Sequence, residues 1–491
     1  MHKLAILNNR WIFFAAAMPG VLLTLMDEFG IHQAIPVITE NFNATIPESQ
    51  WIALGYLLST GALLLPAGRL ADRIGYKRLY FVGLIVFVIG AVLATFSPSL
   101  LSLILFKVLQ GVAAAMIQAT TIPIIISKFP NDRGKALGAF GFLMALSAII
   151  GPVIGGGIVT LFSWRAFMFL SVPLGLFSIV LAWFVLNIFE NDSASGDGKK
   201  NTFDWIGVML STGSLLLLLL TLSKANDYGW GSYVTVVGFL ITGLLLIAFI
   251  VWESKFEFPL LPLHLFMDGT FLTAQLGMFL VVLGNSIIFF LMPFYIQDLK
   301  GYEAFISGLV VAGIPFGFLT TGPVLGVLSD RYPNGWKLFL PSGLLISATS
   351  MLLLSFLTMD NSIWYSFLCM YLMGFGIGFI FIPAQNAIYG MIDKKDQGVV
   401  TGFINMVRNS STLTSIAVGA AIVTSVMASQ GYPASLDAVR EGTLAGIYNS
   451  FMQGMITTFL IGFCVIAIGV LITTMSYFLV KQNKPSNGKK I

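Results

Sequence analysis

Charged side chains are scarce in this chain. Asp, Glu, Lys and Arg together make up 10% of its 491 residues, whereas soluble proteins average about 25%. Hydrophobic residues make up 57%. A soluble fold of this length would need far more polar surface, so the composition excludes an ordinary water-soluble protein and indicates an integral membrane protein.

Residues that bind metals or form disulfides are also few. The chain contains three histidines and two cysteines, Cys369 and Cys464, and both cysteines lie in apolar runs. No Cys-x-x-Cys pair and no cluster of His and Cys occurs, so neither a metal site nor a disulfide framework is supported. We therefore expect no metal and no cofactor.

Signatures of ATP use, catalysis and nucleic-acid binding are missing as well. The phosphate-binding pattern GxxxxGK(S/T) does not occur, which argues against direct drive by ATP. No His, Asp and Ser residues within the apolar runs have catalytic spacing, and no appended soluble domain is evident, so a membrane-embedded enzyme or a sensor is not supported. The net charge of +4 comes without a basic, aromatic-rich patch, so no nucleic-acid partner is expected.

Long apolar runs are what the chain has in abundance. A bilayer core about 30 Å thick needs roughly 20 apolar residues per helix. Fourteen runs meet this length, and we predict that each forms a membrane-spanning helix. The runs lie at about 11–33, 51–68, 79–96, 100–127, 135–160, 166–188, 203–223, 233–251, 271–294, 305–328, 338–357, 363–388, 398–426 and 450–480.

Lys and Arg are distributed unevenly among the segments that connect these runs. If the N-terminus lies inside, the inside segments hold 20 of the 26 Lys and Arg residues and the outside segments hold four. Because loops that stay in the cytoplasm carry an excess of Lys and Arg, this distribution predicts a protein of the cell membrane with both termini in the cytoplasm.

A weak internal repeat divides the chain. Residues 68–78 (GRLADRIGYKR) follow the second apolar run, and residues 326–337 (GVLSDRYPNGWK) follow the tenth, so each follows the second helix of a six-helix block. The predicted fold class is an all-α membrane protein with fourteen transmembrane helices, arranged as two pseudo-symmetric six-helix bundles plus an inserted helix pair. The expected division is 1–190 for the first bundle, 191–255 for a polar linker and the inserted pair, and 256–491 for the second bundle.

Residues 68–78 resemble the loop signature of the major facilitator superfamily, and the fourteen spans resemble its drug:proton antiporter branch. The resemblance implies a conformational latch, in which glycines permit a tight turn while Asp72 pairs with arginines and caps a helix end. The residues assigned to this latch are Gly68, Asp72, Arg73, Gly75 and Arg78 and, in the second half, Asp330 and Arg331. The alternative is that these are only the positive charges of an inside loop.

Residues 151–157 (GPVIGGG) resemble the GPxxGG signature that the family associates with exporters. Small residues let helices approach closely, and proline bends a helix. We therefore expect a hinge and a tight helix seam formed by Gly151, Pro152, Gly155 and Gly156. Helix packing alone would account for the same residues.

Four charged residues lie well inside the predicted spans, away from their ends: Asp27, Glu28, Lys107 and Arg408. The segment around Asp27 partly resembles the pattern in the first span of the antiporter branch, and Lys107 stands where the family usually has Arg. A charge inside a membrane is unfavourable unless it is paired or hydrated, so such residues mark functional sites. We predict that these four take part in proton coupling or substrate binding.

Helix geometry restricts how these charges can be arranged. Asp27 and Lys107 fall at a similar depth and can face each other, whereas Glu28 points about 100° away from Asp27 around the same helix. His32 stands one turn beyond Glu28. A carboxylate that takes up a proton on one side and releases it on the other would couple transport to protons. Two alternatives stay open: Lys107 extends to the outer interface, or Glu28 and His32 line an outer vestibule filled with water.

Further polar residues within the spans are candidates for the lining of a central cavity. Each alone is compatible with a helix–helix hydrogen bond. Together they indicate polar positions in an aromatic- and Met-rich lining that suits bulky amphipathic substrates. The candidates are Gln110, Gln118, Tyr295, Gln385, Asn386 and Asn405.

The main hypothesis from the sequence is proton-coupled efflux of hydrophobic or cationic small molecules by alternating access between two halves. The alternative cargo is an endogenous lipid, peptide or siderophore. Expected partners are the small-molecule substrate, protons and the lipid bilayer, and the protein is expected to be a monomer without enzymatic activity.

Overall fold

The computed structural model describes residues 10–186, 204–256, 259–433, 436, 438–439 and 446–482. Within these ranges the regular secondary structure is entirely helical. Fourteen helical segments are long and apolar enough to cross a membrane, which confirms the predicted fold class and the predicted number of spans. The polar linker expected at 191–202 lies outside the described residues.

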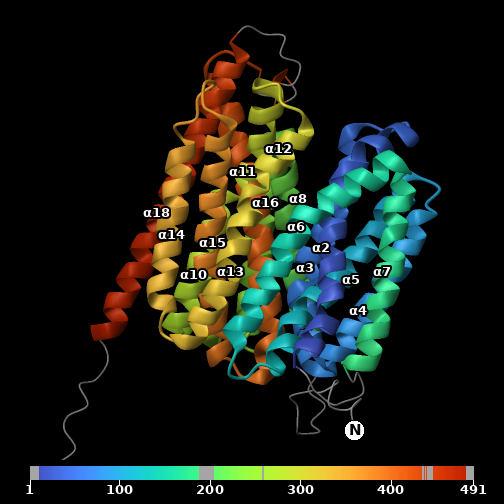
Figure 1. Ribbon diagram of the computed structural model, residues 1–491, viewed down its shortest axis with the longest axis vertical. Coiled ribbons are helices and arrows are strands. Elements are labelled where there is room, and N and C mark those ends of the chain that lie inside the picture. The colour runs from blue at the N-terminus through green and yellow to red at the C-terminus, as the bar shows by residue number, and fades with distance from the viewer. Residues whose placement is uncertain are drawn as a thin grey trace, which may run out of the picture. The chain divides into compact units, whose positions relative to one another are not determined.

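The helices follow one another along the chain in the order that Figure 1 colours from blue to red. The first six spans are α2 (Arg10–Asn41), α3 (Ile46–Ile74), α4 (Tyr76–Thr95), α5 (Leu100–Ser127), α6 (Arg133–Leu161) and α7 (Trp164–Val185). The next two are α8 (Trp205–Tyr228) and α9 (Tyr233–Glu253).

The last six spans include several interrupted helices. A 3-10 turn, η1 (Leu263–Met267), precedes them, and the ninth span changes from α-helix to π-helix near its end. The elements are α10 (Gly269–Asn285), α11 (Ile287–Pro293), η2 (Phe294–Leu299), α12 (Ala304–Val311), α13 (Gly313–Arg331), α14 (Trp336–Leu354), α15 (Ile363–Met391), η3 (Lys394–Asp396), α16 (Gln397–Ser429) and α18 (Ile447–Gln482).

Side-chain caps define where several helices begin. Thr45 and Glu48 form a reciprocal capping box at the start of α3, and Ser99 with Ser102 forms one at the start of α5. Ser163 accepts a hydrogen bond from the first turn of α7. Such caps supply acceptors for backbone amides that have no partner within the helix.

The first span is longer than the sequence predicts. The apolar run indicates 11–33, whereas α2 continues to Asn41. Pro36 lies inside α2 and does not end it, because a proline removes only one backbone donor and neighbouring helices can support the bend. The backbone leaves the helix at Asn43, which has a φ of 48°. Asp27 therefore lies near the middle of its helix.

The second span also extends beyond its predicted limits of 51–68. The helix α3 continues to Ile74 and ends at Gly75, whose φ of 99° is readily adopted only by glycine. Gly68 and Asp72 are therefore helical, and the expected tight turn is made by Gly75 alone.

Packing divides the helices into two units. The first comprises the described residues up to Pro262 together with Ile392–Leu413, and the second comprises Leu263–Met391 with the described residues from Thr414. In the first unit, α2 packs on α6 and α7, α5 packs on α3 and α4, and α8 packs on α3 and α9. In the second, α15 packs on α13 and α14, and α18 packs on α10 and α14. The predicted division at 1–190, 191–255 and 256–491 stays a prediction.

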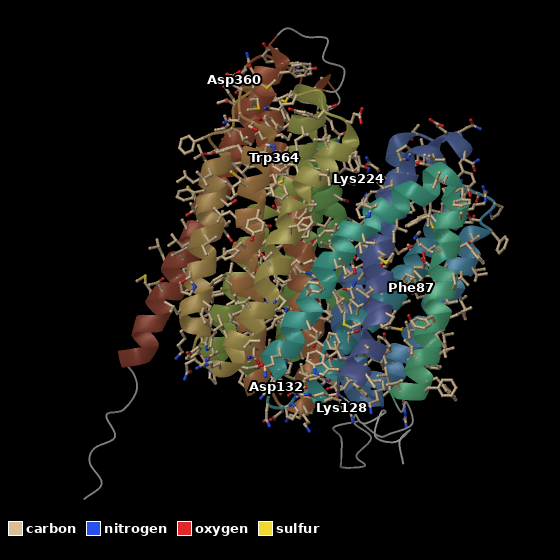
Figure 2. The ribbon with its side chains drawn as sticks, viewed as in Figure 1. Phe87, Lys128, Asp132, Lys224, Asp360 and Trp364 are labelled. Carbon is tan, nitrogen blue, oxygen red and sulfur yellow. The ribbon has the colours of Figure 1, made fainter. Side chains whose placement is uncertain are left out.

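Charged side chains gather at the helix ends of the first unit. Figure 2 shows Lys128 and Asp132 at one end of this unit and Lys224 near the other. The ion pair between Asp132 and Arg10 ties the start of α2 to the start of α6. Asp132 also pairs with Lys135 in the first turn of α6 (Nζ–Oδ1 2.6 Å). The hydrogen bond from Lys135 and that from Arg10 lower the pKa of Asp132.

Candidate functional site

A buried ion pair joins α2 to α5. The Lys107 ammonium lies 2.9 Å from Asp27 Oδ1 and 2.8 Å from Asp27 Oδ2. The side chains of Lys107 and Asp27 are 1% and 2% exposed. A buried charge without a partner is strongly destabilising, so each of these charges makes the burial of the other tolerable. The structure thus brings the two residues into direct contact, and Lys107 does not extend to an interface.

Tyr56 of α3 packs beside this ion pair. Its ring centre lies 6.0 Å from Lys107 Nζ, and its hydroxyl donates a hydrogen bond to the Thr24 carbonyl of α2 (3.1 Å). Three helices therefore meet around the two charges. Tyr56 is not among the residues predicted for the site, because one aromatic residue in an apolar run carries no signal of its own.

Glu28 has a different environment from that of Asp27. It faces another side of α2 and is half-buried. Arg408 of α16 interacts with it electrostatically, but among the described residues the two form no direct ion pair. His32, one turn further along α2, is exposed. Asp27 is therefore held at close range by a cation, whereas Glu28 has only a more distant cation and remains accessible.

A close backbone contact between α2 and α6 lies at Gly30, two residues along α2 from Glu28. A Cβ atom on Gly155 would lie 2.9 Å from both the Cα and the carbonyl oxygen of Gly30, and one on Gly30 would lie 3.1 Å from the Gly151 oxygen. Such distances leave no room for side chains, so the seam requires glycine on both helices. Pro152 lies inside α6 between the two contact points. The partner on α2, Gly30, is a residue that the sequence did not single out.

Other glycines of the same motif do not belong to the seam. A Cβ atom on Gly156 would make an ordinary contact of 3.9 Å with Gln33, and one on Gly157 would meet nothing within 4 Å. Gly156 can therefore accept a side chain without displacing α2. The structure thus limits the tight contact to Gly151 and Gly155, and the hinge stays a prediction.

Asp72 caps the start of α16. Its Oδ1 accepts a hydrogen bond from the Gly398 amide (2.8 Å), and its Oδ2 accepts one from the Val399 amide (2.9 Å). The first amides of a helix lack hydrogen-bond partners within the helix and carry partial positive charge. A carboxylate accepts their hydrogen bonds and its negative charge is attracted to this partial positive charge. The Tyr76 hydroxyl donates a third hydrogen bond to Asp72 (2.7 Å).

Two further contacts join α3 to the start of α16. Arg69 Nη1 lies 3.5 Å from Asp396 Oδ1. The backbones also approach closely, because a Cβ atom on Gly68 would lie 2.9 Å from the Cα of Val399. Arg69 and Asp396 are absent from the predicted site. A motif read from one segment does not reveal a partner more than 300 residues away.

The remaining latch residues of the first half lie at the turn after α3. Gly75 makes the turn, and the arginines on either side of it, Arg73 and Arg78, are exposed. The hydrogen bonds that the structure gives to Asp72 come from amides and from a tyrosine hydroxyl. The expected arginine pairing of Asp72 is therefore not its closest interaction.

The corresponding segment of the second half makes a different contact. The Asn386 side-chain amide of α15 donates to Asp330 Oδ1 (3.4 Å) and to Ser329 Oγ (3.2 Å), both on α13. Arg331 is the last residue of α13. This segment therefore joins two helices of the second unit, and Asn386, predicted to line a cavity, takes part in that connection.

The predicted cavity residues divide between the two units. Gln110, Gln118 and Asn405 lie in the first unit, and Tyr295, Gln385 and Asn386 lie in the second. Tyr295 is fully buried and its hydroxyl donates to the Thr358 carbonyl (2.7 Å), so it connects parts of its own unit. Gln385 is half-buried and Asn405 is buried.

Two of the glutamines carry acceptors without partners. Gln110 and Gln118 are both buried on α5, and among the described residues neither side-chain oxygen has a hydrogen-bond donor. The Gln110 side chain packs against Gly90 of α4. Buried acceptors are normally satisfied, so these two positions are where α5 can still accept a hydrogen bond from water or a ligand.

Comparison with known proteins identifies the family. The sequence profile of the Major Facilitator Superfamily matches residues 17–416. The chain belongs to this superfamily. The match begins in α2 and ends in α16, so it includes the Asp27–Lys107 ion pair and the cap that Asp72 forms on α16.

Several members of the superfamily resemble this chain over most of their length. The riboflavin transporter RibZ of Clostridioides difficile (strain 630) is 28% identical, over 82% of this chain and 86% of that protein. The tetracenomycin C resistance and export protein of Streptomyces glaucescens is 28% identical, over 86% and 76%. The multidrug transporter protein MdtP of Bacillus subtilis (strain 168) is 27% identical, over 80% and 72%.

A solved structure shares the fold. The human organic anion transporter MFSD10 (TETRAN) matches with a TM-score of 0.61 at 14% sequence identity, covering 93% of this chain and 99% of that one. Membership of the superfamily makes this chain a transporter of small molecules in a membrane and not an enzyme, which confirms both expectations from the sequence.

Proposed function

We propose that this protein exports hydrophobic or cationic small molecules across the cell membrane in exchange for protons. The observation that carries the proposal is the pair of adjacent acids in the middle of α2, of which Asp27 is bonded to Lys107 while Glu28 is not directly paired. Carboxylates at such depth are rare and mark ion and proton pathways in transporters. Two of the similar superfamily members are named for export or multidrug transport.

Glu28 is the proton carrier in this proposal. Asp27 is engaged by Lys107, because both of its oxygens bond that ammonium and removal of either residue would leave the other charge buried without its partner. Glu28 is half-buried and feels only the more distant charge of Arg408. Its protonation therefore leaves no closely bonded cation behind.

Competition between proton and substrate explains the exchange. An ionised Glu28 attracts a cationic or polarised substrate into the site, and a protonated Glu28 releases it. If the bound proton weakens binding of the substrate, the bound substrate weakens binding of the proton by the same factor. A proton that arrives from outside therefore expels substrate, and a substrate that arrives from inside expels a proton.

Alternating access needs a contact that breaks and reforms. The cap of Asp72 on α16, together with the Arg69–Asp396 ion pair, is suited to this role because each interaction is local and polar. We place this contact and both termini on the cytoplasmic side, as the distribution of Lys and Arg indicates. The glycine seam between α2 and α6 lets movement of α6 reach the part of α2 that carries Glu28, two residues from Gly30. Each chain acts as a monomer.

The cargo has a second candidate. The riboflavin transporter of C. difficile is as similar to this chain as the tetracenomycin C exporter, at 28% identity. An endogenous compound is therefore a candidate beside foreign drugs, and it includes riboflavin together with the lipid, peptide and siderophore classes considered from the sequence.

Reconstitution into liposomes tests the proposal. In vesicles with an acidic interior, addition of a transported compound should release protons and raise the internal pH. A panel of cationic dyes, neutral hydrophobic drugs and riboflavin identifies the cargo. If a compound accumulates in the vesicles while the internal pH follows that of empty liposomes, proton coupling is wrong even though transport is established.

A further inference from the structure

Asp204 lies at the start of the inserted helix pair, and only one of its two carboxyl oxygens accepts hydrogen bonds from the described residues. Its Oδ1 accepts hydrogen bonds from the Gly207 amide of α8 (2.8 Å) and from Trp252 Nε1 of α9 (2.9 Å). Its Oδ2 has no hydrogen-bond partner among the described residues. The residue is 4% exposed, so bulk water does not satisfy this second oxygen.

Glu253, the last residue of α9, also has one carboxyl oxygen that lacks a hydrogen-bond donor among the described residues. Its Oε2 accepts a hydrogen bond from the Leu261 amide (3.0 Å). Its Oε1 has no partner in the part of the chain that the structure describes. Glu253 is 2% exposed, so each of two buried carboxyl groups has one oxygen satisfied and one without a donor.

The two unsatisfied oxygens converge on one point. A Cβ atom built on Gly207 would lie less than 3 Å from Asp204 Oδ2 and also less than 3 Å from Glu253 Oε1. Two atoms that both lie within 3 Å of one point are less than 6 Å apart. Glycine at position 207 keeps this space free of a side chain, so both oxygens are directed into the same small space.

The charges around this pair favour a cationic ligand. Arg69 of α3 interacts electrostatically with Glu253, but the same guanidinium lies 3.5 Å from Asp396. Asp72 also interacts electrostatically with Arg69, so this guanidinium is divided among Glu253, Asp396 and Asp72. Buried carboxyl groups that face each other without a counter-charge are strongly unfavourable when both are ionised.

A proton fits this site better than a metal ion. Hard metal cations require about six or more oxygen ligands, whereas only two unsatisfied oxygens meet here. No group of three or more potential metal ligands occurs in the described residues. One hydrogen atom between the two oxygens would provide the missing donor for both, as in carboxyl pairs that share a proton.

We propose that Asp204 and Glu253 bind one shared proton, forming a proton site of the inserted helix pair that is separate from Glu28. The Leu261 amide bonded to Glu253 belongs to the segment that leads from α9 to the second unit, which begins at Leu263. The shared proton keeps Glu253 oriented towards that amide. Loss of the proton places two negative charges in the same small space and weakens the attachment of this segment.

Infrared spectroscopy of the purified protein tests the inference directly, because only a protonated carboxyl group gives a carboxylic C=O stretching band. The variants are Asp204→Asn, which retains an N-cap oxygen for the Gly207 amide, and Glu253→Gln, which retains an acceptor for the Leu261 amide. The control is Glu28→Gln. Unchanged thermal unfolding verifies that the variants fold.

The expected result is one carboxylic band at neutral pH that either single substitution removes, because a shared proton needs both groups. Glu28→Gln should leave this band in place, so the outcome does not depend on the transport proposal. Loss of the band in only one of the two variants would show an isolated protonated acid and would overturn the shared site. A wild-type spectrum without a band that belongs to either residue would also overturn it.

Discussion

The ammonium of Lys107 on α5 bonds both carboxylate oxygens of Asp27 on α2, at 2.9 and 2.8 Å, in a region where both side chains are almost fully buried. The next residue, Glu28, has no such partner among the described residues. Two consecutive acids on one helix therefore differ in what they can do. Asp27 joins α2 to α5 through the buried ion pair, and Glu28 is the acid that we propose as the proton carrier.

Breaking the buried ion pair should destabilise the protein. Lys107→Ala or Asp27→Asn leaves one buried charge without its partner, and such changes cost about 3–5 kcal/mol. The double variant Asp27→Asn with Lys107→Met should be more stable than Lys107→Ala, because no buried charge remains. Unfolding experiments in detergent measure the order of stability of the wild type and these variants. If the single and double variants lose equal stability, the interaction between the two charges is not the source of the destabilisation.

Proton coupling should depend on Glu28. Glu28→Gln removes the titratable group but keeps the size and polarity of the side chain, so substrate-induced proton release in liposomes should disappear. The matched control is Glu48→Gln, which changes a surface glutamate at the start of α3. Undiminished proton release in Glu28→Gln, and also in the double variant with Asp27→Asn, would exclude both acids as the coupling site.

The seam between α2 and α6 should not tolerate a side chain. Gly155→Ala introduces a Cβ atom 2.9 Å from Gly30, and overpacking of this kind costs about 1–3 kcal/mol. Both stability and transport should fall. Gly157→Ala on the same helix is the control, since its Cβ atom would meet nothing within 4 Å. Similar behaviour of the two variants would exclude the close contact as the cause.

The cap on α16 should influence transport. Asp72→Ala leaves the amides of Gly398 and Val399 without an acceptor, which costs about 1–3 kcal/mol for each buried group left unsatisfied. Asp72→Asn keeps one acceptor oxygen and should have an intermediate effect. Transport rates in liposomes and unfolding temperatures are measured together. A normal transport rate in a folded Asp72→Ala variant would contradict a latch at this position.

The loss of folding stability at acidic pH should depend in part on protonation of Asp132. Its hydrogen bonds with Lys135 and Arg10 lower its pKa in the folded state. A group with a lowered pKa stabilises the fold above its unfolded pKa of about 3.9, and this contribution disappears as the pH falls through the folded value. Asp132→Asn should therefore flatten the loss of stability at acidic pH. Asp360→Asn, an exposed aspartate at one end of the second unit (Figure 2), controls for the removal of one surface charge.

The number of spans and the family could be predicted from the sequence because both depend on local patterns. An apolar run of about 20 residues must satisfy its backbone internally, so it forms a helix wherever it enters the membrane. Helix ends were less predictable. Pro36 does not terminate α2, because a proline removes only one backbone donor. Asp72 lies inside α3, because tertiary hydrogen bonds satisfy its carboxylate.

The partners of the functional residues were decided only by the tertiary structure. The sequence placed Asp27 and Lys107 at a similar depth, but the rotation of each helix about its axis determines whether two side chains meet. The resemblance implied that Asp72 caps a helix end, but not that this helix is α16. The sequence carried no indication that Asp204 and Glu253 converge at Gly207. Hydropathy is a property of each segment, whereas these contacts depend on how separate helices are rotated, shifted and packed against each other.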